Sequence, residues 1–482
     1  MAEQIPLFPH QKEALTRFQE TGVLGCWHDA GTGKTRLSVE CVKFLIETLP
    51  QEFFRAIIFT PNSVQEEWVK NFERWYSDCP IPVTILRGAG AKKAYTINNT
   101  QGSHIYIINY EALDNEDVKS AIVGFAPDMK IADEVHRIKN HKSARSKFCV
   151  KLQTKYRLAL TGTLESNGYE DLYMPFRFLQ HDIFPGNYNF FLRSYFVNEN
   201  ADNRFVSWPS WKAKAESVTQ FEKIKLQIGT VVKKTETLEL PPLLHQYHYI
   251  DLHSSICSAY KDMERDYVAW FESDEGRDAV SAQLAITRTL RLRQITCGIL
   301  QGDNTIECVH QNKDQVLGEL LTELSPANKV VVWATFRPSI EHLKKVILGY
   351  GFYERNLAVI TGGQTSEQRQ QEIARFKNEL QCGIMLANPK AGGTGIDGLQ
   401  VASYAIYYNK DFSYVDYQQS LARTYRSGSE QHKSVTAIHL VTRNTVEEIV
   451  EEALAHKHEL QSYDIAMLLR ERYGKKHKRK AA

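Results

Sequence analysis

The chain has 482 residues, which is too long for one ordinary hydrophobic core and predicts two large domains or three small ones. With 43% hydrophobic and 24% charged residues, the composition is that of a globular protein and excludes a largely disordered one. The net charge is +2, from 59 basic and 57 acidic residues, so binding of nucleic acid would have to depend on local groups of charge.

The cysteine pattern and the lack of long apolar runs indicate the compartment. Eight cysteines are scattered without a CxxC pair, and histidines do not cluster at metal-ligand spacing, so neither a disulfide framework nor a zinc site is expected. The N-terminal sequence lacks an apolar run of signal-peptide length, and nowhere do 18 apolar residues follow one another. We therefore expect a soluble protein of a reducing compartment: cytoplasmic and nucleoid-associated in a bacterium or phage-infected host, or nuclear in a eukaryote.

Residues 1–171 alternate short apolar segments with amphipathic ones, which predicts a parallel sheet covered by helices. The expected strands are TGVLGCW, RAIIFT, HIYIINY, MKIADE and YRLALTGT. The segments LSVECVKFLIETL and SVQEEWVKNFERWY place apolar residues at helical spacing. This part of the chain is the expected first lobe of an α/β protein.

The segment HDAGTGKTR, residues 28–36, is the first candidate site. Gly31 and Gly33 allow backbone N–H groups to turn toward phosphate oxygens. Lys34 would supply a charge for the β- and γ-phosphates, and Thr35 a hydroxyl for Mg²⁺. His28 stands where the usual GxxxxGKS/T pattern has its first glycine, so the strand before the loop and the helix after it support the prediction. The alternative is a glycine-rich turn that binds nothing.

The rest of the chain predicts an insertion, a crossover and a second lobe. Residues 172–228 are rich in aromatic residues and predict a helical insertion, and residues 229–275 predict a crossover linker that contains Pro241-Pro242. Residues 276–460 alternate again, through NKVVVWATF, IEHLKKVILGY, LAVITGG, SEQRQQEIARFK, GIMLANP, YAIYYN and VTAIHLV, and predict a second α/β lobe. Residues 461–482 comprise a helix end and a basic tail.

Two further motifs carry residues suited to phosphoryl chemistry. Asp133 and Glu134 follow an apolar strand, where one carboxylate can complete a Mg²⁺ shell and the other can orient or deprotonate water. Arg423 and Arg426 lie three residues apart in the second lobe and could stabilise charge on a transferred phosphoryl group. Taken singly, such acids could be a solvated strand end and such arginines a solvated helix face. Their occurrence together with the GKT loop favours ATP hydrolysis.

In this order the motifs resemble the Swi/Snf-like branch of superfamily-two helicase-related ATPases, from near Pro9 to about Ile449. DEVHRIKN is similar to the signature DEAHRxKN of that branch, LALTGTLESNGYEDLY to LTGTPxxNxxxELW, and VVKKTETLELPP to RRxKxxVxxxLPP. LRLRQIT, VVVWATF, KAGGTGIDGLQVA, QSLARTYRSGS and NTVEEIV are similar to its later motifs. Leu164, Ser429 and Asn409-Lys410 depart from the pattern, which bears on coupling rather than on hydrolysis.

The resemblance implies two RecA-like lobes with ATP and Mg²⁺ in a cleft between them. The implied nucleotide contacts are Gln11, Gly31, Thr32, Gly33, Lys34, Thr35 and Arg36, with Thr35 and Asp133 on the metal. The implied catalytic residues are Lys34, Asp133, Glu134, Gln419, Arg423 and Arg426. Residues implied to couple the cleft to DNA are His136, Thr161, Gly395 and Asp397.

The resemblance also implies contacts with the backbone of DNA, because short polar groups and glycine amides suit phosphates and position a duplex without reading its bases. The residues concerned are Thr60, Pro61, Asn62, Asn109, Tyr110, Thr361, Gly362, Lys390, Gly392, Gly393 and Thr394. The expected protein is therefore a monomeric, DNA-stimulated ATPase that translocates on double-stranded or branched DNA and remodels forks, joints or protein–DNA complexes. Because little lies outside the matched core, we expect a compact bacterial or phage-type member that acts in repair, recombination or replication.

Two other functions stay open from the sequence. One is a helicase of superfamily two that separates strands or migrates branches. The other, from a different class, is a DNA-binding scaffold with a dead nucleotide site. The candidate catalytic residues argue against it, since all are intact: Lys34, Asp133, Glu134, Arg423 and Arg426.

Overall fold

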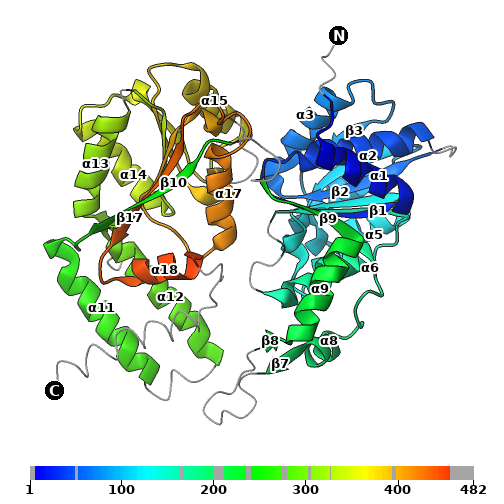
Figure 1. Ribbon diagram of the computed structural model, residues 1–482, viewed down its shortest axis with the longest axis horizontal. Coiled ribbons are helices and arrows are strands. Elements are labelled where there is room, and N and C mark those ends of the chain that lie inside the picture. The colour runs from blue at the N-terminus through cyan, green and yellow to red at the C-terminus, as the bar shows by residue number, and fades with distance from the viewer. Residues whose placement is uncertain are drawn as a thin grey trace. The chain divides into compact units, whose positions relative to one another are not determined.

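The chain folds into two compact units, Met1–Leu238 and Glu239–Ala482 (Figure 1). The computed structural model describes residues 6–48, 53–162, 164, 168–198, 211–234, 240–272, 279–301, 306–325, 327–392 and 398–455, and every structural statement below concerns these residues. The expected basic tail, residues 461–482, lies outside them.

The first unit is built on a seven-stranded parallel sheet in the order β3-β4-β2-β5-β6-β1-β9. Its strands are β1 (Val23–His28), β2 (Arg55–Thr60), β3 (Val83–Ile85), β4 (His104–Asn109), β5 (Met129–Asp133), β6 (Tyr156–Thr161) and β9 (Gly229–Val232). Its helices are α1 (Pro9–Thr21), α2 (Lys34–Thr48), α3 (Gln65–Trp75), α4 (Gly90–Asn98), α5 (Glu116–Phe125), α6 (Ala144–Lys151), α7 (Tyr173–Leu179), α8 (Tyr188–Tyr195) and α9 (Ala215–Ile228). The predicted parallel sheet with helices is confirmed.

Both faces of this sheet are covered, which explains why its strands read as continuous apolar runs. Along β2, Ile57 and Phe59 belong to one buried cluster, whereas Ala56 and Ile58 belong to another. The side chains of successive strand residues point to opposite faces, so one strand serves both clusters. The site loops at the strand ends are thereby held by a sheet that is buried on both sides.

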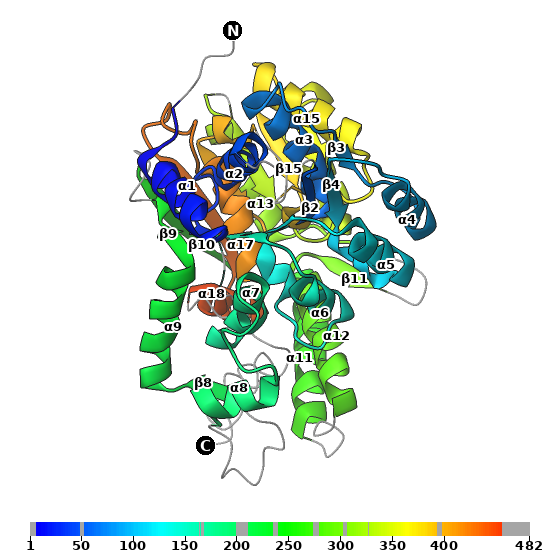
Figure 2. The ribbon, with the colours of Figure 1, turned by 90° about the vertical axis from the view of Figure 1, so that its right-hand side faces the viewer.

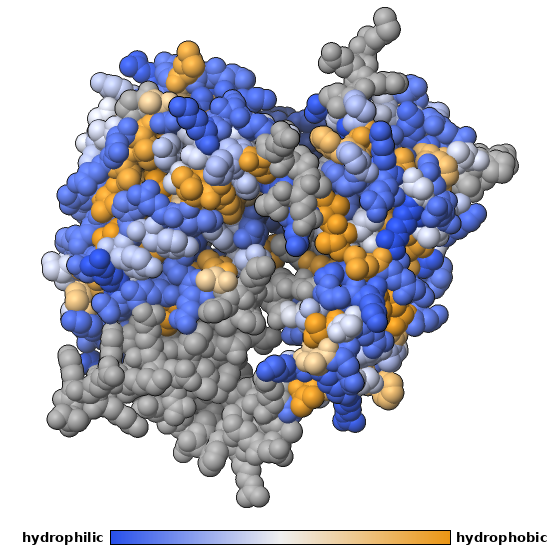
Figure 3. Space-filling view, viewed as in Figure 1, coloured by the Kyte–Doolittle hydropathy of each residue, from blue (hydrophilic) through white to orange (hydrophobic). Residues whose placement is uncertain are grey.

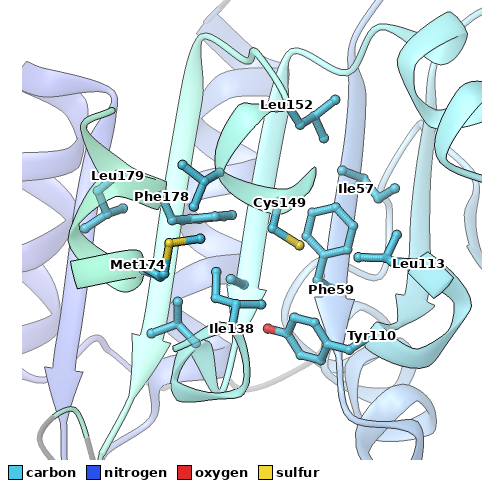
Figure 4. Close-up of a cluster of buried hydrophobic side chains, with 14 of the residues drawn as sticks. Ile57, Phe59, Tyr110, Leu113, Ile138, Cys149, Leu152, Met174, Phe178 and Leu179 are labelled. Carbon is cyan, nitrogen blue, oxygen red and sulfur yellow. The ribbon is translucent and has the colours of Figure 1, made fainter. Parts of the chain in front are cut away.

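The expected helical insertion shares the core of the first unit. In Figure 4, Met174, Phe178 and Leu179 of α7 lie in the same group of buried side chains as Ile57 and Phe59 of β2. Beyond α7, the short strands β7 (Phe196–Asn198) and β8 (Trp211–Ala213) pair antiparallel. In both ribbon views α8, β8 and α9 lie together at one end of the unit (Figures 1 and 2). Most of the described residues of this segment are therefore helical, and its first helix covers one face of the sheet.

The second unit contains a six-stranded parallel sheet in the order β10-β17-β16-β13-β15-β14. Its strands are β10 (Leu243–Ile250), β13 (Val330–Trp333), β14 (Leu357–Ile360), β15 (Ile384–Ala387), β16 (Tyr404–Tyr407) and β17 (Val435–Thr442). Its helices are α11 (Ser254–Glu272), α12 (Ala279–Thr296), α13 (Asn312–Leu324), α14 (Arg337–Gly349), α15 (Ser366–Asn378), α16 (Pro389–Gly392), α17 (Tyr414–Thr424) and α18 (Val446–Ala455). A small antiparallel pair is formed by β11 (Ile299–Gln301) and β12 (Ile306–Cys308). The second predicted α/β lobe is likewise confirmed.

The segment that we expected to be a crossover linker, residues 229–275, contributes strands to both sheets. β9 pairs with β1 of the first unit, and β10 pairs along its whole length with β17 of the second. The two strands belong to different units, so the chain passes from one sheet to the other between Val232 and Leu243, in a shorter segment than we expected. α11, at the end of the expected linker, belongs to the second unit.

Two observations concern the hydropathy of the surface and of the helices. On the face drawn in Figure 3, hydrophilic residues predominate, with smaller hydrophobic groups among them. Of the helices that the structure describes, none combines the length and the apolar character that crossing a bilayer would require.

A buried ion pair joins α13 to α18 in the second unit. The ammonium of Lys313 lies 2.6 Å from Glu447 Oε1 and also donates to the carbonyl of Tyr408. The same carboxylate accepts hydrogen bonds from Thr296 Oγ1 and from the Thr442 N–H. Breaking one side of a buried pair leaves an uncompensated charge, so its loss is far more costly than the loss of an exposed pair.

Lys313→Met is therefore expected to destabilise the second unit by about 3–5 kcal/mol. A matched control is Lys344→Met, which removes an exposed partner of Glu354 and is expected to cost about 1 kcal/mol or less. The urea dependence of hydrogen exchange, followed in peptides from α13 and α18, would measure the free energy of unfolding of the second unit separately from that of the first. Equal effects of the two substitutions would show that the buried pair has no special weight.

Candidate nucleotide and nucleic-acid sites

The loop between β1 and α2 is shaped around the ammonium of Lys34. Gly31 and Gly33 have φ values of 88° and 85°, in the left-handed region that side chains with a Cβ rarely adopt. Lys34 Nζ donates to the carbonyl oxygens of His28 at 2.6 Å and Asp29 at 3.0 Å. Burial lowers the pKa of Lys34 below its usual value. The carboxylates of Glu134, Asp133 and Asp29 offset only part of this shift. The expected phosphate-binding residues are thus brought together as a loop with a cation inside it.

The N-terminal helix is fastened to this loop. Gln11 Nε2 donates to the carbonyl of Gly33 at 3.1 Å, and Gln11 Oε1 accepts from the N–H of Phe8. The φ of Gly33 favours glycine, and a Cβ added there would lie 2.3 Å from Gln11 Nε2 and would displace the end of that side chain. His10 Nε2 lies 3.0 Å from the carbonyl of Thr32. His10 was not predicted, and its place directly before Gln11 is the signal that could have identified it.

The structure gives a reason for His28 in place of the usual first glycine. His28 is the last residue of β1, and its carbonyl rather than its side chain faces Lys34. Its imidazole points to β9, where Nε2 lies 2.7 Å from Thr230 Oγ1. Burial and the charge of Lys34 lower the pKa of His28 to about 3, so the ring is neutral beside the cation. The substitution therefore anchors β9 and leaves the loop intact.

Asp133 ends β5 with its carboxylate held by side chains from neighbouring segments. Its Oδ2 accepts hydrogen bonds from Thr60 Oγ1 at 3.0 Å and Trp68 Nε1 at 2.9 Å. Its main-chain carbonyl accepts from the hydroxyl of Tyr110 at 2.7 Å. Burial, followed by the charge of Glu134, raises the pKa of Asp133, and the two side-chain hydrogen bonds oppose this shift. Trp68 was not predicted as a site residue. It occupies an apolar position of an amphipathic helix, and such a position indicates core packing.

Glu134 has an unusual backbone for a residue with a side chain. Its φ is 54° and its ψ 56°, a left-handed conformation that is held at a cost of about 1–3 kcal/mol. This turn directs the carboxylate toward the end of β6, where Oε2 lies 3.3 Å from His136 Nδ1 and 3.4 Å from Thr161 Oγ1. His136 Nδ1 and Thr161 Oγ1 are themselves 3.1 Å apart. The three predicted residues therefore form one group.

Arg36 faces the N-terminal segment. Its guanidinium lies 4.1 Å from the centroid of the Trp75 ring, and Nη1 donates to the carbonyl of Pro6 at 3.3 Å. Thr35, the second residue of α2, is half-buried next to it.

Two of the expected DNA-contacting residues line a hollow of about 470 Å³ in the first unit. Asn62 and Asn109 lie in its wall together with Arg87 and Lys93. Lys93 Nζ donates to Asn109 Oδ1 at 2.9 Å, and the guanidinium of Arg87 pairs with Glu66. The sequence analysis missed the two cations, although the run RGAGAKK, residues 87–93, contains the glycine and basic residues that suit phosphate.

Three other residues of the first unit that were expected to contact DNA are buried. The side chains of Thr60 and Tyr110 are buried, and the hydroxyl of Thr60 donates to the carboxylate of Asp133 whereas that of Tyr110 donates to its main-chain carbonyl. Pro61 is buried as well. Thr60 and Pro61 precede the exposed Asn62 at the end of β2, and Tyr110 follows Asn109 at the end of β4, so that contact of these residues with DNA stays a prediction.

In the second unit, α17 carries Gln419 and Arg423 four residues apart, hence on one face of the helix. Arg426 follows the end of the helix, in a turn where Gly428 has a φ of 99°. The N–H of Ser429 donates to the carbonyl of Arg426 at 2.9 Å. Ser429, which departs from the family pattern, is buried and closes this turn with its main chain.

Only some of the expected DNA contacts and coupling residues of the second unit lie among the described residues. Lys390 Nζ lies 3.2 Å from Asp411 Oδ2 and 3.8 Å from Asp416 Oδ2, at the edge of a cavity of about 230 Å³. The N–H of Thr361 donates to Gln364 Oε1, and Gly362 follows it after β14. Gly392 ends α16. Gly393, Thr394, Gly395 and Asp397 lie outside the described residues.

The raised pKa of Asp133 predicts the acid limb of any Mg²⁺-dependent turnover. A carboxyl must lose its proton to bind the metal, so turnover should fall on acidification at a higher pH than an ordinary aspartate would give. Trp68→Phe removes a hydrogen bond that favours the charged form, and should move this limb to still higher pH. Trp211→Phe in β8 is the control. Identical pH–rate profiles for all three proteins would contradict the assignment.

Comparisons with known proteins agree with the order of these motifs. Residues 13–299 match the family described as the SNF2-related domain, and residues 312–428 match the helicase conserved C-terminal domain. The ISWI chromatin-remodeling complex ATPase ISW1 of Saccharomyces cerevisiae is 26% identical over 89% of this chain and 37% of its own length. The DNA repair and recombination protein RAD54-like of Drosophila ananassae is 23% identical over 95% of this chain and 62% of its own length. This chain thus spans less than two thirds of either relative.

Among solved structures, the Sulfolobus solfataricus SWI2/SNF2 ATPase core in complex with dsDNA aligns with 97% of this chain and 95% of its own length, at 19% identity and a TM-score of 0.44.

Proposed function

The chain belongs to the SNF2-related family, and on that premise we propose that it is a DNA-stimulated ATPase that translocates on double-stranded DNA. The observation that supports this most strongly is the group around the strand ends of the first unit. There a glycine loop encloses Lys34, and a buried Asp133 precedes a backbone-strained Glu134. These are the groups that phosphoryl transfer to water requires.

ATP and Mg²⁺ fit the residues present. The loop's Lys34 would leave its two carbonyl partners for the β- and γ-phosphates, and Gln11 would orient the adenine from the helix that is bonded to Gly33. Thr35 and Asp133 would hold Mg²⁺, which neutralises charge on the phosphates. Because both side-chain donors to Asp133 use Oδ2, we assign Oδ1 to the metal.

Glu134 would orient the attacking water and accept its proton. Its contacts with His136 and Thr161 link that carboxylate to the ends of β5 and β6. We propose that a change at the γ-phosphate reaches the rest of the first unit through this group. Gln419, Arg423 and Arg426 would come from the second unit, so that neither unit alone holds the complete site. Closure of the two units around ATP and opening after hydrolysis would then move one set of DNA contacts relative to the other.

The proposed DNA contacts of the first unit are Asn62, Arg87, Lys93 and Asn109, and we assign Thr60 and Tyr110 instead to the support of Asp133. Those of the second unit are Thr361, Gly362, Lys390 and Gly392, together with Gly393 and Thr394. Gly395 and Asp397 follow as proposed coupling residues.

Lys93 is largely buried but lines the hollow, and Lys93→Ala is expected to weaken binding of duplex DNA about equally for all sequences, because its ammonium would contact phosphate there and not a base. The slope of log affinity against log salt should fall by about one. Lys119→Ala, on α5 and paired with Glu116, is the control and should leave the slope unchanged. Fluorescence anisotropy with labelled duplexes of two sequences, over a salt series, measures both quantities. An unchanged slope for Lys93→Ala would remove this residue from the interface.

Displacement of a third strand from a DNA triplex tests translocation as distinct from hydrolysis. A translocase releases the third strand when ATP is present and leaves the underlying duplex paired. Processive release of single strands from a tailed duplex would favour the alternative, a strand-separating or branch-migrating helicase. Duplex binding with no ATP turnover would favour a DNA-binding scaffold. The relatives' names mention chromatin remodelling and DNA repair and recombination, and we propose remodelling of forks, joints or protein–DNA complexes in that light.

A further inference from the structure

We propose that His310, Asp314 and His342 in the second unit form a binding site for a transition-metal ion, best suited to Zn²⁺. Asp314 Oδ2 lies 3.1 Å from His310 Nδ1 and 2.8 Å from His342 Nε2. The three potential ligand atoms all lie within 4.8 Å of one another. This site is independent of the ATP site, whose residues lie on other segments.

Two adjacent helices and the segment before the first of them bring the three residues together. Asp314 lies in the first turn of α13, and His310 precedes it by four residues. His342 lies on α14, which contacts α13. The spacing between Asp314 and His342 is set by a strand and two helix segments, so no short sequence motif marks the site. For this reason the sequence predicted no zinc site.

The distances fit a metal. Tetrahedral Zn²⁺ with bonds of about 2.0–2.2 Å to nitrogen and oxygen separates its ligand atoms by roughly 3.3 Å, so the 3.1 Å separation from His310 nearly fits and the 2.8 Å separation from His342 would lengthen when the ion binds. Each imidazole can offer its lone pair once the ring proton resides on its other nitrogen. Two nitrogens and one carboxylate oxygen favour Zn²⁺ over Mg²⁺ or Ca²⁺, which take oxygen ligands.

The surroundings of the carboxylate resemble those of metal ligands. Asp314 is fully buried, and its second oxygen, Oδ1, accepts from the hydroxyl of Tyr408 at 2.8 Å. The N–H of Gln311 donates to Oδ2 at 2.7 Å. Hydrogen bonds of this kind fix the orientation of a ligating carboxylate. His310 has a side chain that is 59% exposed, so an ion can enter from solvent and water can fill a fourth position.

The competing explanation is a network in which both histidines donate to Asp314 without any metal. The two explanations differ in what happens when metal is added to the full-length chain. The chain also carries cysteines, which the structure shows as free thiols and which could bind metal themselves. The experiment must therefore separate nitrogen and oxygen ligands from sulfur.

The test is a titration of the chelator-treated, full-length protein with Co²⁺ and then with Zn²⁺. We expect a single equivalent of Co²⁺ to give visible d–d absorption without a sulfur-to-cobalt charge-transfer band, and Zn²⁺ to displace it. His310→Gln and His342→Gln should each weaken Zn²⁺ binding by more than about tenfold, since even loss of an outer partner of a ligand costs that much. His253→Gln, whose ring contacts Ser255 outside the cluster, should bind as the unchanged protein does.

The titration of the variants distinguishes the metal site from the metal-free network. His310 is exposed, so His310→Gln should fold even if His342→Gln does not. Zn²⁺ binding of equal strength in His310→Gln and in the unchanged protein, no binding at all, or a charge-transfer band that indicates cysteine would each overturn the proposal.

Discussion

Lys34→Ala is expected to abolish ATP turnover and to weaken nucleotide binding, whereas Glu134→Gln is expected to stop turnover while ATP stays bound. Lys34 supplies the cation that is enclosed by the phosphate-binding loop, so its removal affects the ground state and the transition state alike. Glu134 would act on the water and not on the phosphates, so its amide should spare affinity. Equilibrium binding of a fluorescent ATP analogue and steady-state hydrolysis, measured on the same samples, separate the two effects.

The control for both substitutions is Lys43→Ala, also on α2 but paired with Glu47 away from the loop. It should keep affinity and turnover. Turnover by Glu134→Gln at the unchanged protein's rate would show that another group activates the water.

Arg426→Ala is expected to lower turnover by about 10³-fold or more if Arg426 acts as an arginine finger, with a smaller effect on ATP affinity. The main chain of Ser429 fixes the turn after α17 and should place the guanidinium reproducibly. Arg443→Ala, an exposed arginine that pairs with Asp251, is the matched control and should turn over normally. A loss of less than tenfold in the rate of single-turnover hydrolysis would show that Arg426 does not stabilise the transition state.

The sheets and the nucleotide loop were predictable because each depends on short-range pattern. The strands are buried on both faces, so RAIIFT and GIMLANP read as apolar runs, and glycines with lysine in GTGKT have few other uses. The extent of the crossover was not predictable in the same way. β10 reads LLHQYHYI and most of its residues are exposed or half-buried, since it is an edge strand with one neighbour, so its pattern lacks the apolar run of a central strand.

The surroundings of the proposed catalytic carboxylates, Asp133 and Glu134, could not be derived from spacing. Trp68 reaches Asp133 from α3, 65 positions earlier in the chain, and nothing local distinguishes this tryptophan from a core residue. Thr60 and Tyr110 were expected to contact DNA because the family resemblance implies phosphate contacts from polar groups of these motifs. Their burial depends on how β2, β4 and β5 pair, which places both of them next to Asp133.

Backbone strain is the other feature that sequence alone does not reveal. Glu134 lies in a left-handed conformation without being glycine, asparagine or aspartate. Residues held in this way are concentrated at functional sites. The strain therefore supports the role that the motif suggested, from an observation that is independent of the motif.

The central claim is that duplex DNA activates ATP hydrolysis by this chain, and steady-state hydrolysis tests it most directly. The full-length protein would be assayed with Mg²⁺ and ATP alone, and then with linear duplex, forked DNA, single-stranded DNA or RNA at equal nucleotide concentration over a salt series. We predict the strongest stimulation by DNA that contains duplex, and a stimulation that weakens as salt rises, because binding depends on phosphate contacts. Hydrolysis that is unaffected by every DNA, or that responds most strongly to RNA, would contradict the account.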